Sequence, residues 1–217
     1  MQDLARQFLS DEDRSRIQSA VKEAERWTSG EIVPMVVSAS YTYPMADVIF
    51  AAVLALPVAI GLAYGVGSRF WIGGQNLWLF IGFFALAFAL FYGAARRWPA
   101  LKRSFISRRE MDEEVEEAAV TRFFTEGLYR TRDETGVLIF ISVFERRVWV
   151  LADRGIDAKI EQGQWEEPVR IIVEGIRQRR QADAICEAVA YVGAVLREHF
   201  PIAPDDSNEL RNLIVEE

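Results

Sequence analysis

The chain has 217 residues, 51% of them hydrophobic, and a formal net charge of −7. This length allows one or two ordinary domains. The single cysteine excludes an intramolecular disulfide and fits a reducing compartment, and one cysteine with one histidine is too few for a Cys/His zinc site. The sequence also lacks a glycine-rich phosphate-binding loop, and we assign no catalytic residue from it.

The N-terminal segment predicts a helix and then a strand. Ser10 is a favourable N-cap, and acidic residues fill the first turn that follows it. Apolar residues recur at helical spacing as far as Trp27. Residues 31–39 have the composition of a strand, in which Pro34 removes one backbone donor and indicates a sheet edge or a bulge.

Two apolar runs, 48–66 and 77–95, follow this strand. Each contains 19 residues and no charge. At about 1.5 Å per residue, each run would span roughly 28 Å as a helix, close to the ~30 Å hydrocarbon core of a bilayer. The runs therefore predict a transmembrane helical hairpin, with Asp47 at the level of the lipid headgroups.

Basic residues determine the predicted orientation of the hairpin. Arg69 lies in the loop between the spans, whereas six basic residues follow the second span: Arg96, Arg97, Lys102, Arg103, Arg108 and Arg109. The positive-inside rule then predicts a protein integral to the cytoplasmic membrane with both termini in the cytoplasm. Because the basic run has few interleaved aromatic residues and adjoins a membrane, anionic lipid explains it better than nucleic acid.

Small residues form a stripe on each predicted span. Four-residue spacing places Gly61 and Gly65 on one face of the first helix, and Ala85, Ala89 and Gly93 on one face of the second. Such faces allow two helices to approach closely. We interpret them as packing within the hairpin, and contact with a second copy or another membrane protein is the alternative.

The segment after the hairpin predicts three helices and two strands. Residues 112–126 have a helical pattern, and 136–143 form a nearly continuous apolar run that is typical of a strand buried on both faces. A turn leads into a second strand, 148–152. Residues 168–179 and 182–200 then predict two helices, of which the second is long and amphipathic.

This order of elements predicts a small sheet with helices on its faces, an α/β sandwich interrupted by the hairpin. The first 44 residues are too few to bury a core alone, so we expect both flanks to fold together. The predicted parts of the chain are residues 1–44, the hairpin 45–97, residues 98–201, and an acidic tail, 202–217, whose polar composition is typical of disorder.

Asp153 and Asp157 are the candidate metal ligands. They flank Gly155 directly after the second strand of the C-terminal segment, and α/β domains place ligands at the carboxyl ends of strands. Carboxylates there could hold Ca²⁺ or Mg²⁺. In the structural alternative, Asp157 caps a helix and Asp153 is solvated or paired with an arginine. Glu31 and Glu145 are further candidate ligands on weaker grounds.

Short motifs in both flanks carry a resemblance to a known family. They are residues 28–33, 135–142, 145–146, 152–156 and 199–201, together with Trp165 and Gly193. These motifs resemble the bacterial membrane branch of the TPM domains, the family that includes the thylakoid lumen phosphatase-like and photosystem II repair proteins. Many relatives have a Gly-x-Gly turn after the central hairpin of strands, whereas this chain has Asp153, Arg154 and Gly155.

The resemblance implies an α/β/α sandwich with a small central sheet, in a protein of the bacterial inner membrane. Some relatives are described as acid phosphatases or divalent-metal binders, and others as accessory or repair factors. For metal binding, the resemblance carries over to Asp153 and Asp157 alone.

Two functions are compatible with these features. The first is a membrane-anchored cytoplasmic TPM-like domain that acts as a binding, assembly or quality-control module. Its partners would be the lipid bilayer and either membrane proteins or copies of itself, but not nucleic acid. The alternative is a phosphatase that depends on a divalent metal, Ca²⁺ or Mg²⁺.

Overall fold

The computed structural model describes residues 4–70, 76–202 and 210–216. The chain forms two compact units. One comprises Thr42–Met111 and contains the apolar helices, and the other combines Gln2–Tyr41 with Asp112–Glu217 and contains the sheet. Residues from before and after the hairpin therefore build the second unit together.

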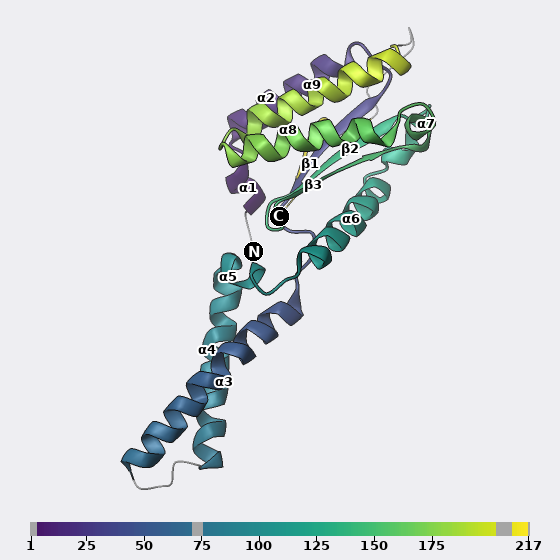
Figure 1. Ribbon diagram of the computed structural model, residues 1–217. Coiled ribbons are helices and arrows are strands. Elements are labelled where there is room, and N and C mark those ends of the chain that lie inside the picture. The colour runs from purple at the N-terminus through teal and green to yellow at the C-terminus, as the bar shows by residue number, and fades with distance from the viewer. Residues whose placement is uncertain (1–3, 71–75, 203–209, 217) are drawn as a thin grey trace. The chain divides into compact units, whose positions relative to one another are not determined.

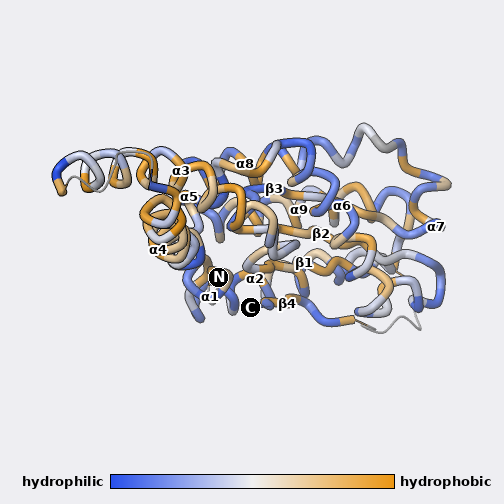
Figure 2. Tube along the Cα trace, turned by 90° about the horizontal axis from the view of Figure 1, so that it is seen from below, coloured by the Kyte–Doolittle hydropathy of each residue, from blue (hydrophilic) through white to orange (hydrophobic). Residues whose placement is uncertain are grey.

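The first unit is built around a helical hairpin. Helices α3 (Pro44–Arg69) and α4 (Leu77–Arg97) lie side by side, and the short α5 (Pro99–Arg103) follows them (Figure 1). The side-chain oxygen of Asn76 accepts hydrogen bonds of 3.0 and 3.1 Å from two backbone N–H groups in the first turn of α4. Hydrophobic residues dominate α4 (Figure 2). By length and composition, α3 and α4 are each able to cross a membrane.

The second unit contains a four-stranded sheet in the order β3-β2-β1-β4. The strands are β1 (Glu31–Val37), β2 (Gly136–Ser142), β3 (Arg147–Ala152) and β4 (Ile214–Glu216). β1 is parallel to both β2 and β4, whereas β2 and β3 form an antiparallel hairpin. The central pair thus joins a strand from before the helical hairpin to one from after it.

Helices cover both faces of this sheet. They are α1 (Leu4–Phe8), α2 (Asp11–Glu25), α6 (Arg108–Thr125), α7 (Arg154–Asp157), α8 (Glu166–Arg177) and α9 (Gln181–His199), with the 3₁₀ turns η1 (Leu128–Arg130) and η2 (Gln162–Trp165). Helices α2, α8 and α9 lie on one face, and α6 lies on the other (Figure 1). Every residue of β1 and β2 is buried, as expected for strands covered on both sides. The predicted α/β/α sandwich with a small central sheet is confirmed.

The N-terminal part of this unit starts as its sequence predicts. Ser10 Oγ accepts a hydrogen bond of 3.2 Å from the backbone N–H of Asp13, and the Asp13 carboxylate accepts one of 3.1 Å from the backbone N–H of Ser10. This reciprocal capping box fixes the start of α2. Ile17 and Val21 of the same helix are fully buried, so its apolar face packs into the core.

The end of the C-terminal tail forms a strand, in contrast to the disorder that the composition of the tail suggested. β4 pairs with residues 35–37 of β1, and the Arg122 guanidinium lies 2.6 Å from the carboxylate of Glu216. The apolar side chains at the end of the tail pack into the core on both faces of the sheet: Leu213 and Val215 on one face, and Ile214 on the other. Because β4 reaches only as far as Met35, Pro34 lies on a part of β1 that has β2 on one side and no pairing with β4.

Candidate functional site

Asp153 occupies a buried position directly after β3. Its Oδ1 accepts a hydrogen bond of 2.8 Å from the backbone N–H of Arg154, so Asp153 is the N-cap of α7. Its own N–H donates to the carbonyl of Gly136 at 2.8 Å, which ties the loop to β2. The residue is only 8% exposed, and Oδ2 has no hydrogen-bond partner among the residues that the structure describes. A buried carboxylate oxygen without a partner requires a physical explanation.

Burial and, to a smaller extent, a neighbouring acidic residue make the charge of Asp153 less favourable. Burial raises the pKa of Asp153, and the negative charge of Glu134 raises it further, while the hydrogen bond from Arg154 opposes both effects. Asp157, at the far end of α7, is exposed. Residual desolvation raises the pKa of Asp157, with a second contribution from the charge of Asp153. The two predicted ligands therefore interact electrostatically, together with Glu134.

Gly155 allows the backbone around this site to approach closely. A Cβ atom at Gly155 would lie 2.6 Å from the carbonyl oxygen of Asp133 and 2.7 Å from that of Glu134. The N–H of Gly155 donates to the Glu134 carbonyl at 3.1 Å, and Glu134 has a φ of 56°, in the left-handed region. Any larger residue at 155 would push this turn away from α7, so glycine is needed for packing at this position.

These groups form a partial set of oxygen ligands. Hard cations such as Ca²⁺ and Mg²⁺ bind carboxylate and carbonyl oxygens. Within the described parts of the chain, however, no three acidic, His or Cys side chains lie close enough together to hold one metal ion. In the structural alternative, Asp157 was expected to cap a helix. The structure does show a capping aspartate in this loop, but it is Asp153.

The position of the aspartates relative to the sheet differs from the prediction. Asp153 does follow the carboxyl end of β3, but β3 is antiparallel to β2. The loop therefore lies beside Gly136, at the amino ends of β1 and β2, and not at the carboxyl edge of the parallel pair. Glu31 begins β1 at this same edge, opposite Gly136 in the register, and its carboxylate accepts the N–H of Leu210 at 3.3 Å.

Glu145 lies at the opposite end of the sheet from the aspartates. Its carboxylate accepts hydrogen bonds from the hydroxyl of Ser142 and, at 3.1 Å, from the backbone N–H of Ser40. Ser40 follows β1 and Ser142 ends β2, so Glu145 joins the carboxyl ends of the two parallel strands. Glu145 is therefore not brought to Asp153 as an added ligand.

A buried ion pair lies in the hairpin unit, and the sequence analysis did not predict it. Lys102 Nζ lies 2.9 Å from Oδ2 of Asp47, and their side chains are 5% and 9% exposed. Lys102 also donates to the backbone carbonyl of Thr42. The sequence analysis counted Lys102 among the basic residues that predict the membrane orientation. In the structure, its charge is paired with Asp47. Arg96, Arg97, Arg108 and Arg109 of that group are exposed, and Arg103 is half-buried.

The contact between α3 and α4 uses other small residues than the predicted ones. Ala51, Ala55, Ala59 and Ala63 form the buried stripe of α3, and Ala87 and Ala95 are buried on α4. Gly61, Gly65, Ala85, Ala89 and Gly93 are all exposed. Residues two positions apart on a helix point roughly 200° apart, so the predicted stripes face away from the hairpin contact. The interpretation as packing within the hairpin is thus corrected, and the alternative, contact with a second copy or partner, stays a prediction.

Comparisons with known proteins show what part of the chain and its fold are similar to. Residues 104–195 match the family model of the TPM domain. The fold is similar to the NMR structure of the BA42 protein from the psychrophilic bacterium Bizionia argentinensis sp. nov., with a TM-score of 0.60 and 18% identity over 100% of both chains. None of the curated proteins matches the chain. The resemblance to the TPM domain family that the sequence motifs predict is therefore confirmed, and residues 104–195 are the part of the chain that matches its domain.

Proposed function

We propose that the chain is a membrane-anchored TPM-like domain that acts as a binding, assembly or quality-control module for membrane proteins or for copies of itself. One observation carries the membrane part: large apolar side chains on the hairpin have no protein cover. Ile60, Tyr64, Leu86 and Leu90 are each between 55% and 66% exposed. Apolar surface costs about 25 cal/mol per Å² in water, so a lipid environment is the favourable surrounding for these helices.

The exposed stripes of small residues support the binding part. An added Cβ at Gly61, Gly65 or Gly93 would meet no heavy atom within 4 Å beyond the adjacent backbone of its own helix. These positions therefore leave shallow surfaces on α3 and α4 that another transmembrane helix can approach closely. In lipid, where the hydrophobic effect does not drive helices together, such close packing is a main source of association.

Association of labelled copies in liposomes tests this proposal. Energy transfer between two fluorescently labelled populations of the full chain should fall when Gly61 and Gly65 are both replaced by leucine, because the branched side chains prevent close approach. Val53→Leu, at an exposed position on the same helix, is the matched control and should leave the transfer unchanged. If neither transfer nor capture of a defined membrane protein depends on these glycines, the proposed binding surface is wrong.

The second candidate function is a phosphatase that depends on a divalent metal. The specific observation in its favour is the buried Oδ2 of Asp153, which lacks a partner among the described residues and lies in the field of Glu134. A cation would neutralise these charges and supply that partner. Ca²⁺ or Mg²⁺ at Asp153 and Asp157 would orient a phosphate ester and stabilise its transition-state charge.

Hydrolysis of p-nitrophenyl phosphate, with and without Mg²⁺ or Ca²⁺, tests this candidate. Activity that EDTA removes and that Asp153→Asn abolishes would support it. Asp183→Asn, at an exposed position on α9, is the matched control. The same metal should stabilise the folded wild type by about 2.7 kcal/mol at a hundredfold excess over its dissociation constant. A protein with neither metal-dependent activity nor a melting shift would leave the loop a structural cap.

A further inference from the structure

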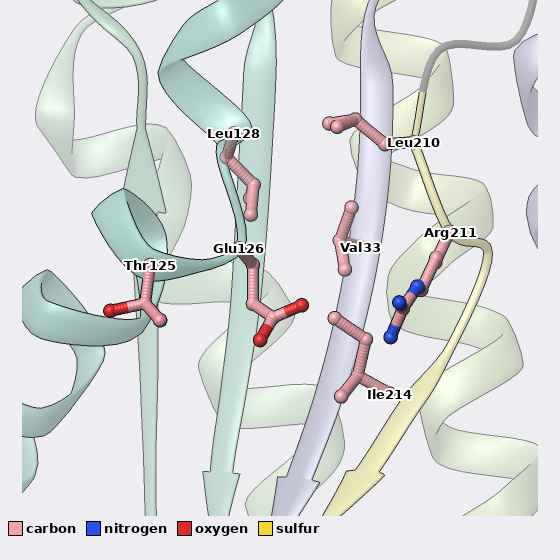
Figure 3. A pocket seen from close by; sticks show the side chains of 7 residues that line it. All are labelled: Val33, Thr125, Glu126, Leu128, Leu210, Arg211 and Ile214. Atoms are coloured by element: carbon pink, nitrogen blue, oxygen red, sulfur yellow. The ribbon is translucent and has the colours of Figure 1, made fainter.

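A pocket lies in the sheet-containing unit, on the face of the sheet that α6 covers. Its volume is about 420 Å³, within the range of roughly 300–1,000 Å³ that small-molecule sites occupy. Val33 of β1 and Ile214 of β4 form an apolar floor, and Leu128 and Leu210 extend it (Figure 3). The end of α6 forms one wall, and the segment leading into β4 forms the other.

The two walls carry opposite charges. Glu126 follows α6 and Arg211 precedes β4, and their charged ends lie on either side of Ile214 (Figure 3). No ion pair joins either side chain to another residue in the described part of the chain. A carboxylate and a guanidinium that share a pocket without pairing are both available to a ligand.

The order of these groups defines a complementary ligand. It carries a cation at one end, an apolar body over Val33 and Ile214, and an anion at the other end. A free amino acid bears both charges on one carbon, and phosphoethanolamine has no apolar side chain between its charges. A dipeptide with free termini and apolar side chains has the required order.

We propose that this pocket binds short apolar peptides with free termini, with the ammonium at Glu126 and the carboxylate at Arg211. The guanidinium of Arg211 can hold a carboxylate through two parallel hydrogen bonds. Contact with this floor removes the aliphatic side chains of the ligand from water, whereas Val33 and Leu128 are already only 1% exposed and gain little further burial. This site does not depend on membrane anchoring or on the metal site, so it goes beyond the proposed function.

Calorimetric titration of the full chain in nanodiscs with leucyl-leucine tests the proposal. N-acetyl-leucyl-leucine lacks the cation and leucyl-leucine amide lacks the anion, so each should bind wild type roughly tenfold more weakly. Glu126→Gln should remove only the preference for leucyl-leucine over N-acetyl-leucyl-leucine. Arg211→Gln should remove only the preference for leucyl-leucine over leucyl-leucine amide. Glu116→Gln and Arg177→Gln, at exposed positions outside the pocket, should change neither preference.

A blocking variant separates the pocket from partition into lipid. Thr125 is exposed and lines the pocket, so Thr125→Trp should abolish binding without disturbing the core. Thr121→Trp, one turn earlier on α6 and outside the lining, should bind normally. Equal affinity for the three peptides, binding that survives Thr125→Trp, or no binding by wild type would each overturn the proposal. Preferential binding of phosphoethanolamine, with the same dependence on Glu126 and Arg211, would assign the pocket to a lipid headgroup and overturn the peptide assignment.

Discussion

Lys102 Nζ and Asp47 Oδ2 lie 2.9 Å apart in a buried ion pair that joins the first turn of α3 to α5. The second oxygen of Asp47 has no hydrogen-bond partner among the described residues. Phe105, three residues after Lys102, packs edge-to-face against Phe50, one turn after Asp47, with ring centroids 5.2 Å apart. The start of the first apolar helix and the segment after the second are thus held by a charged contact and an aromatic one.

Removing one partner of this pair is expected to destabilise the hairpin unit. Lys102→Met leaves the Asp47 carboxylate buried and uncompensated, which costs about 3–5 kcal/mol for a buried pair. Asp47→Leu should have a comparable cost, because it leaves the buried ammonium of Lys102 without its carboxylate. Thermal unfolding of the full chain in detergent, followed by circular dichroism, measures both.

The double variant distinguishes a coupled pair from two independent contacts. Asp47→Leu with Lys102→Met removes both charges, so its cost should be well below the sum of the single costs. Additive costs would contradict the paired geometry. Arg96→Met, at an exposed position, is the matched control and should change stability by less than about 0.5 kcal/mol.

The predicted topology can be checked by cysteine labelling in a Cys186→Ser background. Ser68 is an exposed position in the last turn of α3, and Lys22 is an exposed position on α2. Since six basic residues follow the second span, Ser68→Cys should react with an impermeant thiol reagent in intact cells and Lys22→Cys only after lysis. The reverse labelling pattern would invert the orientation.

Local patterns in the sequence were sufficient to predict most of the fold. Ser10 marks the start of α2 through a contact with a residue three positions away, and the apolar run around Ile139 marks a doubly covered strand. Both signals are contained within one element, so they can be read without knowing what packs against it. The overall α/β/α architecture then follows from the order of such elements.

Features that depend on distant contacts could not be predicted in the same way. β4 has only three residues, a pattern too short to indicate a strand. It is held in place by pairing with β1 at Met35 and by the ion pair between Arg122 and Glu216. The pairing of Asp47 with Lys102 links positions 55 residues apart. The direction of β3 also decides which sheet edge carries Asp153. By contrast with the other features, this direction could have been predicted, because strands joined by a short turn are antiparallel.

The raised pKa of Asp153 predicts a pH-dependent effect on stability. Because its pKa is higher in the folded than in the unfolded state, ionised Asp153 opposes folding at neutral pH. As the pH falls through the folded pKa, the folded state takes up the proton first, and this penalty disappears. Asp153→Asn keeps an acceptor for the N–H of Arg154 without the charge, so it should be more stable than wild type at pH 7.

The difference between the two proteins is the quantity to measure. Melting temperatures of wild type and Asp153→Asn in metal-free buffer should converge as the pH is lowered toward the ordinary carboxyl range. Subtracting one from the other removes most contributions from other carboxyl groups. A difference that stays constant between pH 7 and pH 4 would show that the Asp153 carboxyl is not perturbed by its surroundings.

Strand β4 is expected to contribute to the stability of the sheet. Truncation after residue 209 removes β4 and exposes Met35 and its neighbours along β1. Loss of the buried side chain of Ile214 alone should cost about 1.5–3 kcal/mol. Arg122→Gln breaks only the partly exposed pair with Glu216 and should cost less than about 1 kcal/mol. Denaturant unfolding of each variant compares the two, and an unchanged midpoint on truncation would show that β4 is dispensable.

The two flanks are expected to fold only in each other's presence. β1 lies between β2 and β4, and its residues Ile32 and Val33 contribute to the cores on opposite faces of the sheet. A fragment comprising residues 112–216 lacks β1 and α2, so it should not unfold cooperatively. By contrast, a chain in which a short flexible linker replaces residues 43–98 keeps every strand and should be soluble and cooperative in urea. Cooperative unfolding of the 112–216 fragment would instead mean that the N-terminal segment is an accessory to an independently stable domain.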